Sequence, residues 1–167
     1  MNKQPFFEYS ISQIVEKYYD MMFYLALARV KNEDDAKDIV QDAFTVLVKH
    51  NDDNKKFNSE EHLKAWLIKV TIFCSQKFMK KFHRETAVSE DMLLETYDMN
   101  DENIAVYNAV MKLSPQHRTI VYLHYYQGYK LKEIAQMLDK TYDSVQSMLK
   151  NAKKKLRQFL SEEDINV

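Results

Sequence analysis

The stretch YKLKEIAQMLDKTYDSVQSMLKNAKKKL, residues 129–156, decides the fold of the C-terminal half of the chain. Its apolar residues recur at the helical spacing of three and four on both sides of a short polar connection, residues 139–141. They are Ile134, Ala135, Leu138, Val145 and Leu149. A short helix, a tight turn and a long helix in this order are typical of a helix-turn-helix unit. The small side chain of Ala135 suits the point where two such helices cross closely.

The second helix of this unit carries the candidate DNA contacts, because a recognition helix lies in the major groove. Its outward-facing residues could meet base edges or phosphates, and its lysine-rich end agrees with that role. They are Tyr142, Asp143, Gln146, Ser147, Lys150, Asn151 and Lys153. An ordinary helical hairpin without DNA-binding activity is the alternative.

Local signals predict where the C-terminal helices begin and end. Ser114 followed by Pro115 predicts a helix start, since serine caps free amides and proline fits the first turn. Gly128 is expected to close that helix in the left-handed conformation. Thr141 is expected to cap a final helix from about Tyr142 to residue 160.

The N-terminal half predicts three helices. The first spans about residues 11–25, the second follows an Asn32 cap, and the third follows a Ser59 cap. We expect one face of the third helix to be the apolar one, and place Trp66 on it as a core residue rather than a base-stacking one. That face comprises Leu63, Trp66, Leu67, Val70, Phe73 and Cys74.

Composition predicts an all-α protein of two small helical domains. Among 167 residues there are one glycine and two prolines, too few for the turns of a strand-rich fold or for a glycine-rich phosphate loop. We expect a first domain at residues 1–85, a polar linker at 86–100 with room for a short helix, and a four-helix domain containing the helix-turn-helix at 101–167.

Charge is segregated along the chain, although the net charge is only −1. Residues 33–53 hold seven acidic residues and two lysines, whereas residues 60–84 hold six basic and two acidic residues. Residues 131–160 hold seven basic and three acidic residues. This pattern favours distinct partners for distinct segments. The single cysteine and the lack of a signal peptide or a long apolar segment favour the cytoplasm.

Residues for catalysis are not apparent. No nucleophile, base and oxyanion donors form a recognisable set, and the five histidines show no metal-type spacing with acids. We therefore expect no enzyme activity, no metal, no cofactor and no small-molecule substrate.

Three stretches together resemble extracytoplasmic-function sigma factors, small two-domain subunits of bacterial transcription initiation. They are DAKDIVQDAFTVLVKH at residues 35–50, HLKAWLIKV at residues 62–70, and the long segment from Leu113 through the helix-turn-helix. The resemblance runs from about Tyr18 to Leu160 apart from the linker. It implies a protein that binds core RNA polymerase and directs promoter-specific initiation.

The resemblance also implies roles for particular residues. The second helix would dock on the β′ clamp helices of the polymerase, whose basic residues need an acidic, hydrogen-bonding surface. Here that surface would be Asp35, Asp38, Gln41 and Asp42. The third helix and its preceding loop would open the minus-ten promoter element and capture a flipped base. The residues expected to track DNA there are Lys55, Lys56, Asn58, Lys69, Lys77, Lys80 and Lys81.

The C-terminal domain would read the minus-thirty-five element and touch the β flap, in a protein that is monomeric when free. The resemblance raises an anti-sigma factor as a further partner without deciding its presence. The chain departs from the family pattern in two places: Phe73 and Lys77 stand where an Asn and an Asp are common, and Gln146 and Met148 replace basic residues. Fewer cationic contacts predict weaker promoter binding by the isolated protein.

Two alternatives remain open at the level of sequence. One is a helix-turn-helix regulator that binds duplex DNA as a homodimer without polymerase. The other is a degenerate sigma-like antagonist that occupies the clamp but cannot melt DNA.

Overall fold

The computed structural model describes residues 9–52, 57–85 and 101–165, and it divides into two compact units. The units comprise residues 1–90 and 91–167. Within the described ranges all regular elements are helical and none is a strand, so the all-α prediction is confirmed. Lys55, Lys56 and the predicted linker lie outside the described residues.

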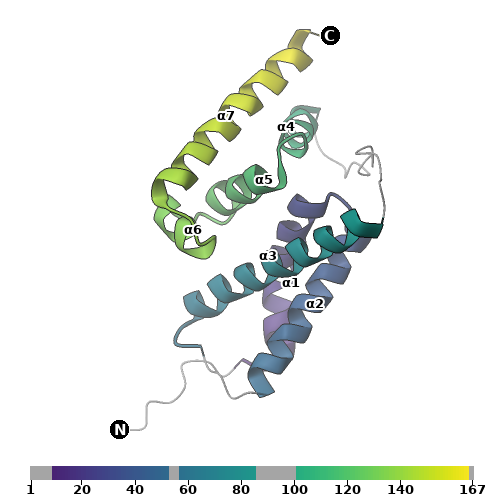
Figure 1. The fold of residues 1–167 in the computed structure, drawn as a ribbon, viewed down its shortest axis with the longest axis vertical. Coiled ribbons are helices and arrows are strands. Elements are labelled where there is room, and N and C mark those ends of the chain that lie inside the picture. Colours follow the sequence, from purple (N-terminus) through teal and green to yellow (C-terminus); the bar gives the residue numbers. More distant parts are fainter. Residues whose placement is uncertain (1–8, 53–56, 86–100, 166–167) are drawn as a thin grey trace. The chain divides into compact units, whose positions relative to one another are not determined.

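The first unit is a three-helix bundle of α1 (Ile11–Val30), α2 (Glu33–Asp52) and α3 (Glu60–Glu85) (Figure 1). The predicted caps of α2 and α3 are confirmed. The Asn32 side-chain oxygen accepts the Asp35 N–H at 2.9 Å, and the Ser59 hydroxyl accepts the His62 N–H at 3.0 Å. Each cap satisfies a backbone donor that the helix itself leaves unpaired.

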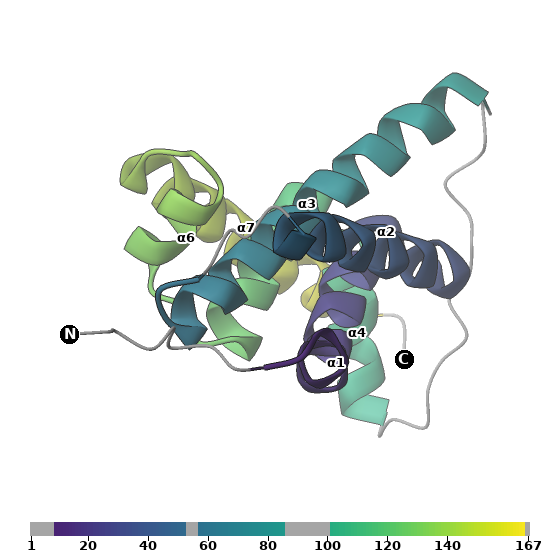
Figure 2. The same cartoon turned by 90° about the horizontal axis from the view of Figure 1, so that it is seen from below.

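The core of this unit forms where each helix packs against the other two. Its largest fully buried side chains come from all three helices. They are Met22, Leu25, Ile39, Val40, Leu47, Leu63, Leu67 and Ile68. The C-terminal turns of α3 run beyond α1 and α2 in Figure 2.

The predicted apolar face of α3 was partly wrong. Phe73 is 62% exposed and Trp66 is only half-buried, whereas Thr71 and Ser75 lie in the core. The hydroxyl of Thr71 donates to the carbonyl of Leu67 at 2.8 Å, and that of Ser75 donates to the carbonyl of Thr71 at 2.7 Å. These bonds to the preceding turn satisfy both hydroxyls, so two residues that look polar in the sequence are buried.

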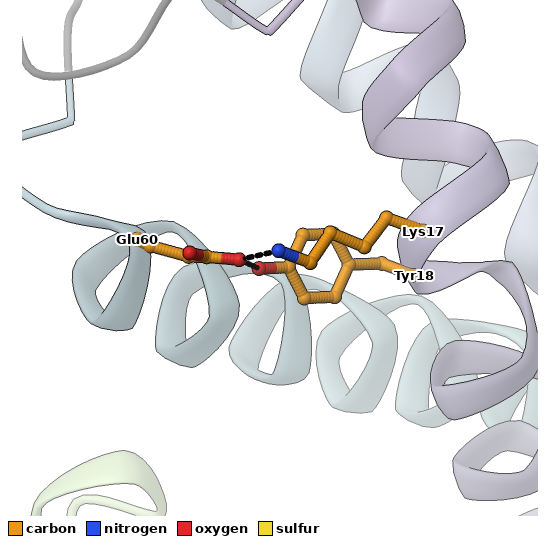
Figure 3. Close-up of polar contacts among 3 residues, drawn as sticks. All are labelled: Lys17, Tyr18 and Glu60. Atoms are coloured by element: carbon orange, nitrogen blue, oxygen red, sulfur yellow. Dashed lines mark hydrogen bonds and ion pairs between the residues drawn. The ribbon is translucent and has the colours of Figure 1, made fainter.

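Glu60 joins the start of α3 to α1 (Figure 3). Its carboxylate accepts a hydrogen bond from the Tyr18 hydroxyl at 2.6 Å and forms an ion pair with the Lys17 ammonium. The hydrogen bond from Lys17, followed by that from Tyr18, lowers the pKa of Glu60 below its ordinary value. The same partner raises the pKa of Lys17.

The second unit contains α4 (Asp101–Met111), α5 (Pro115–Val121), the π-helical turn η1 (Tyr122–Tyr126), α6 (Leu131–Met137) and α7 (Tyr142–Ile165). Ser114 caps α5 with Pro115 in its first turn, as predicted. α7 packs against α4, α5 and α6. A cluster in its core contains Leu113, Val121 and Ala152, with Leu156 and Phe159 packed against it.

Contrary to the expectation from the sequence, the helix that begins at Pro115 does not continue regularly up to Gly128. The π-helical turn η1 intervenes, and the chain then turns back through a bond from the Tyr129 N–H to the Leu123 carbonyl at 3.0 Å. The Nδ1 atom of His124 lies 2.8 Å from the Tyr129 carbonyl oxygen. Gly128 has φ +73°, which confirms the predicted left-handed conformation.

Arg118 closes the turn between α4 and α5 from inside the second unit. The residue is 3% exposed, and its guanidinium donates to the carbonyls of Met111, at 3.4 Å, and of Leu113. These carbonyls lie at the end of α4, where a helix has no donors of its own to offer them. A buried cation thus serves as the C-terminal cap of α4.

Candidate nucleic-acid and polymerase interface

The predicted polymerase-binding residues share one face of α2. Asp38, Gln41 and Asp42 are exposed and Asp35 is half-buried, whereas Ala36, Ile39, Val40 and Ala43 face the core. We call Asp35, Asp38, Gln41 and Asp42 the acidic surface. Burial, followed by repulsion from Asp38 and Asp34, raises the pKa of Asp35. Repulsion from Asp38 and Asp34 is the smaller part of this shift, and a basic partner would relieve that part.

The described lysines of the predicted minus-ten region are all exposed. Lys69, Lys77 and Lys80 follow one another at helical spacing on the side of α3 opposite its buried hydroxyls, and Lys81 is adjacent. We call these four residues the basic surface of α3. Asn58 is exposed just before the helix. The structure therefore brings the predicted α3 lysines onto one solvent-facing side.

A cluster of aromatic rings joins the end of α2 to the start of α3, and sequence reasoning missed it. The rings of His50 and Phe57 are stacked with centroids 4.9 Å apart, and Trp66 lies 4.6 Å from His50 and 5.2 Å from Phe57. The ring of His62 packs edge-on against Phe57, and its Nδ1 accepts the Asn58 N–H at 3.1 Å. Trp66 thus packs beside the connecting segment rather than in the bundle core.

This aromatic cluster holds both ends of the connection between α2 and α3. Aromatic rings at these centroid distances attract one another by more than the burial of their surface alone would give. The cluster therefore holds residues 57–59 in position just before α3. Its members come from α2, the connecting segment and α3, so the period of a single helix does not reveal the cluster. The only signal that could have revealed it was the density of histidine and aromatic residues at 50–66.

All of the predicted DNA-contacting residues of α7 are exposed. Tyr142, Asp143, Gln146, Ser147, Lys150, Asn151 and Lys153 are all solvent-facing, whereas Val145, Leu149 and Ala152 are buried. We call the seven exposed residues the recognition surface. The ammonium of Lys153 lies 5.8 Å from the centroid of the Tyr125 ring, a cation–π distance, so this lysine packs along η1.

The turn between α6 and α7 has the geometry that the sequence predicts. Asp139 takes up the left-handed conformation with φ +53°, and the hydroxyl of Thr141 accepts the Ser144 N–H at 3.2 Å as the cap of α7. Ile134 and Ala135 of α6 are buried in the same unit as Val145 and Leu149 of α7. The short helix α6 therefore packs against the long helix α7 and leaves the outer side of its first turns exposed to solvent.

Neither a metal site nor a membrane-spanning helix is found in the part of the chain that the structure describes. In the part of the chain that the structure describes, no cluster of three or more His, Cys, Asp or Glu residues could hold a metal ion. The helices of that part also include none with the length and apolar character needed to cross a membrane.

A three-helix unit with an acidic and a basic face, and a second unit built on a helix-turn-helix, define a class of protein that joins a protein partner to DNA. Comparison with known families identifies this class. Residues 14–85 match sigma-70 region 2, and residues 103–156 match sigma-70, region 4. The chain belongs to the sigma-70 family of RNA polymerase sigma factors and is of the extracytoplasmic-function type.

Individual relatives agree with this assignment. RNA polymerase sigma factor SigV of Bacillus subtilis (strain 168) is 29% identical over 146 residues, covering 85% of this chain and 86% of that protein. RNA polymerase sigma factor YlaC of the same organism is 23% identical over 163 residues, covering 91% and 92%. The sigma factor RpoE from Bartonella quintana, solved in complex with the anti-sigma factor NepR, matches with a TM-score of 0.74. At 19% identity over 90% of this chain and 96% of that one, this match shows the shared fold.

The function follows from the family. The protein is an RNA polymerase sigma factor: it binds core polymerase and directs transcription initiation, and it is not itself an enzyme. This finding favours the sigma-factor interpretation over the independent regulator and the antagonist.

Proposed function

We propose that three separate surfaces of this sigma factor divide the work of initiation. The observation that carries the proposal is the separation of charge: an acidic surface on α2, a basic surface on α3, and an exposed recognition surface on α7. Each suits a different partner. The domain boundaries at residues 1–85, 86–100 and 101–167 are part of the same proposal.

The acidic surface binds the β′ clamp helices of the polymerase. Burial is the main reason that the pKa of Asp35 is raised, and a partner that supplies basic side chains would offset the smaller contribution from Asp38 and Asp34. Gln41 adds a hydrogen-bonding group at the centre of the surface, where it fixes orientation as well as charge. The apolar side of the same helix packs in the core, so a partner has to dock on the exposed side, where this surface lies.

The basic surface of α3 and the segment before it contact the minus-ten element as the strands separate. The four lysines of the surface, together with Lys55 and Lys56, neutralise phosphates of the nontemplate strand. The aromatic cluster supports the capture of a flipped base, because it anchors the segment from Phe57 to Asn58 against α3. No hydrolysis is needed, since contacts with the captured strand offset the cost of opening.

The recognition surface reads the minus-thirty-five element, and the second unit also touches the β flap. Amide and hydroxyl groups dominate the centre of the surface, with Lys150 and Lys153 beyond them. Gln146 and Asn151 are suited to adenine, whose edge offers one donor and one acceptor in the major groove. The protein is cytoplasmic and monomeric when free, and an anti-sigma factor is a further partner of the class.

In vitro transcription tests the proposal. Purified protein and bacterial core RNA polymerase are incubated with a pool of promoter fragments, in parallel with an Asp38→Lys/Asp42→Lys variant. We expect specific transcripts from the wild type that disappear in the variant, because the charge reversal opposes the basic clamp. Core binding without transcripts would point to an antagonist, and transcripts that survive the reversal would remove the acidic surface from the proposal.

A control variant distinguishes the effect of charge at the acidic surface from the effect of charge elsewhere on α2. Asp52→Lys changes an exposed acid in the last turn of α2, away from the acidic surface. We expect it to leave core binding and transcription within about twofold of wild type, since isolated exposed charges contribute little. Equal losses in both variants would mean that net charge, and not this surface, governs the interaction.

A further inference from the structure

Tyr125 of η1 is an exposed aromatic residue whose ring lies against the recognition helix α7. The side chain is 53% exposed, and the centroid of its ring is 5.8 Å from the ammonium nitrogen of Lys153. Lys153 is itself exposed, and within the described residues no carboxylate forms an ion pair with it. An ammonium group has three donors, so contact with one ring face leaves the others available to a partner.

The π-helical turn and His124 fix the direction of the Tyr125 ring. The Nδ1 atom of His124 lies 2.8 Å from the Tyr129 carbonyl oxygen, and the His124 ring packs edge-on against Tyr125 with centroids 5.0 Å apart. The next residue, Tyr126, stacks instead on Tyr122 within η1, with centroids 5.9 Å apart. The packing of the turn therefore directs Tyr125 toward α7 and holds Tyr126 along η1.

We propose that Tyr125 is a positioning residue for DNA binding: its ring holds the Lys153 ammonium at the edge of the recognition surface, where the lysine binds a DNA phosphate. This inference rests on the proposed contact between the recognition surface and the minus-thirty-five element. A free lysine side chain loses rotamer freedom when it binds a phosphate, which weakens the complex. The Tyr125 ring restricts that freedom before DNA arrives, and because the ring is uncharged it leaves the positive charge of the lysine intact.

The Kd of holoenzyme for a promoter from the transcription pool tests the inference. Tyr125→Leu removes the ring, and we expect it to weaken binding about 2- to 5-fold, as the loss of an exposed cation–π contact would. Tyr125→Phe keeps the ring face and should bind as wild type does. A loss in Tyr125→Phe equal to that in Tyr125→Leu would assign the effect to the hydroxyl and overturn the proposal. Far-ultraviolet circular dichroism checks that each variant folds.

A double-mutant cycle with Lys153 shows whether Tyr125 acts through this lysine. Lys153→Gln should weaken binding and lower the magnitude of the slope of log Kd against log salt concentration by about 1. In the Lys153→Gln background, Tyr125→Leu should have no further effect. Equal losses in both backgrounds would overturn the proposal, since the ring would then contact DNA or polymerase by itself.

The same cycle distinguishes failure of the inference from failure of the proposed function. If Lys153→Gln weakens binding but Tyr125→Leu does not, the phosphate contact stands and the positioning role of Tyr125 is overturned. If Lys153→Gln changes neither the affinity nor the slope, the proposed phosphate contact fails and the inference fails with it.

Tyr126→Leu is the matched control in this cycle. It removes an exposed ring of η1 that stacks on Tyr122. Whatever its own effect on binding, that effect should be the same in the wild-type and Lys153→Gln backgrounds. Coupling as strong as that of Tyr125→Leu would mean that the turn as a whole positions the lysine, and would overturn the role of the Tyr125 ring.

Neutral methylphosphonate groups locate the phosphate directly. They replace single phosphates of the minus-thirty-five element, one position at a time. One position should weaken binding by wild-type holoenzyme but not by Lys153→Gln. At that position the loss should be smaller in Tyr125→Leu and should return to its wild-type size in Tyr125→Phe. A full loss in Tyr125→Leu would show that the lysine reaches the phosphate without the ring, and would overturn the proposal.

Discussion

At the scale of single residues, Glu60 shows how one carboxylate can join two helices. It accepts hydrogen bonds from Lys17 and Tyr18 of α1 while starting α3 (Figure 3). These partners lower its pKa, so the folded protein binds a proton there less readily than the unfolded chain does. The contact therefore stabilises the fold above the pKa of an unfolded glutamate, and the contribution disappears as pH falls through the lower folded value.

Glu60→Gln tests this contribution. We expect the variant to be less stable than wild type at neutral pH, with the difference shrinking as pH falls through the folded pKa of Glu60. The effect should be small and should decrease with salt, because the side chains of Lys17 and Glu60 are 46% and 44% exposed. Urea unfolding across a pH series measures it through the fluorescence of Trp66, the single tryptophan. Glu61→Gln is the matched control at the next, exposed position, and an equal pH dependence there would contradict the assignment.

In the second unit, Arg118 joins α5 to the end of α4 much as Glu60 joins α3 to α1, but its side chain is buried. Arg118→Met removes the donors to the Met111 and Leu113 carbonyls, and leaving such buried acceptors unpaired costs about 1 to 3 kcal/mol. We expect the free energy of unfolding to fall by that amount, as followed by far-ultraviolet circular dichroism. The transition seen by Trp66 reports on the first unit and should not move. Arg157→Met, at an exposed position of α7, should change neither transition.

At the scale of helices, local side-chain hydrogen bonds determine where a helix begins, whereas tertiary packing determines which of its faces is buried. The caps at Asn32, Ser59, Ser114 and Thr141 were predictable because each bond spans only three residues of sequence. The inner face of α3 was predicted only in part, because the buried hydroxyl of Thr71 is satisfied by a bond that hydrophobicity does not reveal.

The π-helical turn and the aromatic cluster mark the limit of prediction from sequence. η1 interrupts a stretch whose residues suit a regular helix, and bonds such as that from Tyr129 to Leu123 depend on where the following turn lies. Trp66 was expected in the core because its spacing from Leu63 and Leu67 fits a helical stripe. It lies instead beside His50 and Phe57, which come from outside its own helix.

The end of α1 offers a prediction at this scale. Lys31, its C-terminal cap, has φ +60°, a left-handed conformation that costs a residue with a Cβ atom but not glycine. Lys31→Gly should therefore raise the free energy of unfolding of the first unit by about 0.5 to 1 kcal/mol. Lys49→Gly, within α2, should lower it by about 1 kcal/mol. Urea unfolding followed at Trp66 measures both, and a loss of stability in both variants would show that the Lys31 conformation is not strained.

At the scale of the whole molecule, affinity for promoter DNA is divided between two units and limited by charge. The net charge is −1, since the acids of α2 balance the lysines of α3 and α7. Counterion release drives nonspecific DNA binding, so a chain without excess positive charge gains little from it. The recognition surface carries only two lysines among its seven residues. These features predict that tight promoter binding needs the polymerase.

Fluorescence anisotropy with a labelled promoter from the transcription pool measures this dependence. We expect the isolated protein to bind with a Kd above about 1 μM at physiological salt, and the holoenzyme to bind with a Kd in the range of about 10⁻⁸ M or tighter. Tight, sequence-specific binding without core polymerase would contradict the prediction.

Asp38→Lys/Asp42→Lys makes this test sharper, because its added positive charge should strengthen nonspecific DNA binding but weaken polymerase binding. The double substitution raises the net charge from −1 by four units, so the isolated variant should bind any duplex somewhat more tightly than wild type. It should also lose polymerase, and with it the specific complex, because the acidic surface has become basic. Stronger nonspecific binding together with weaker holoenzyme binding would locate specificity in the assembly. If the variant holoenzyme instead bound the promoter more tightly, DNA affinity would reside in this chain alone, and the acidic surface would have no part in docking.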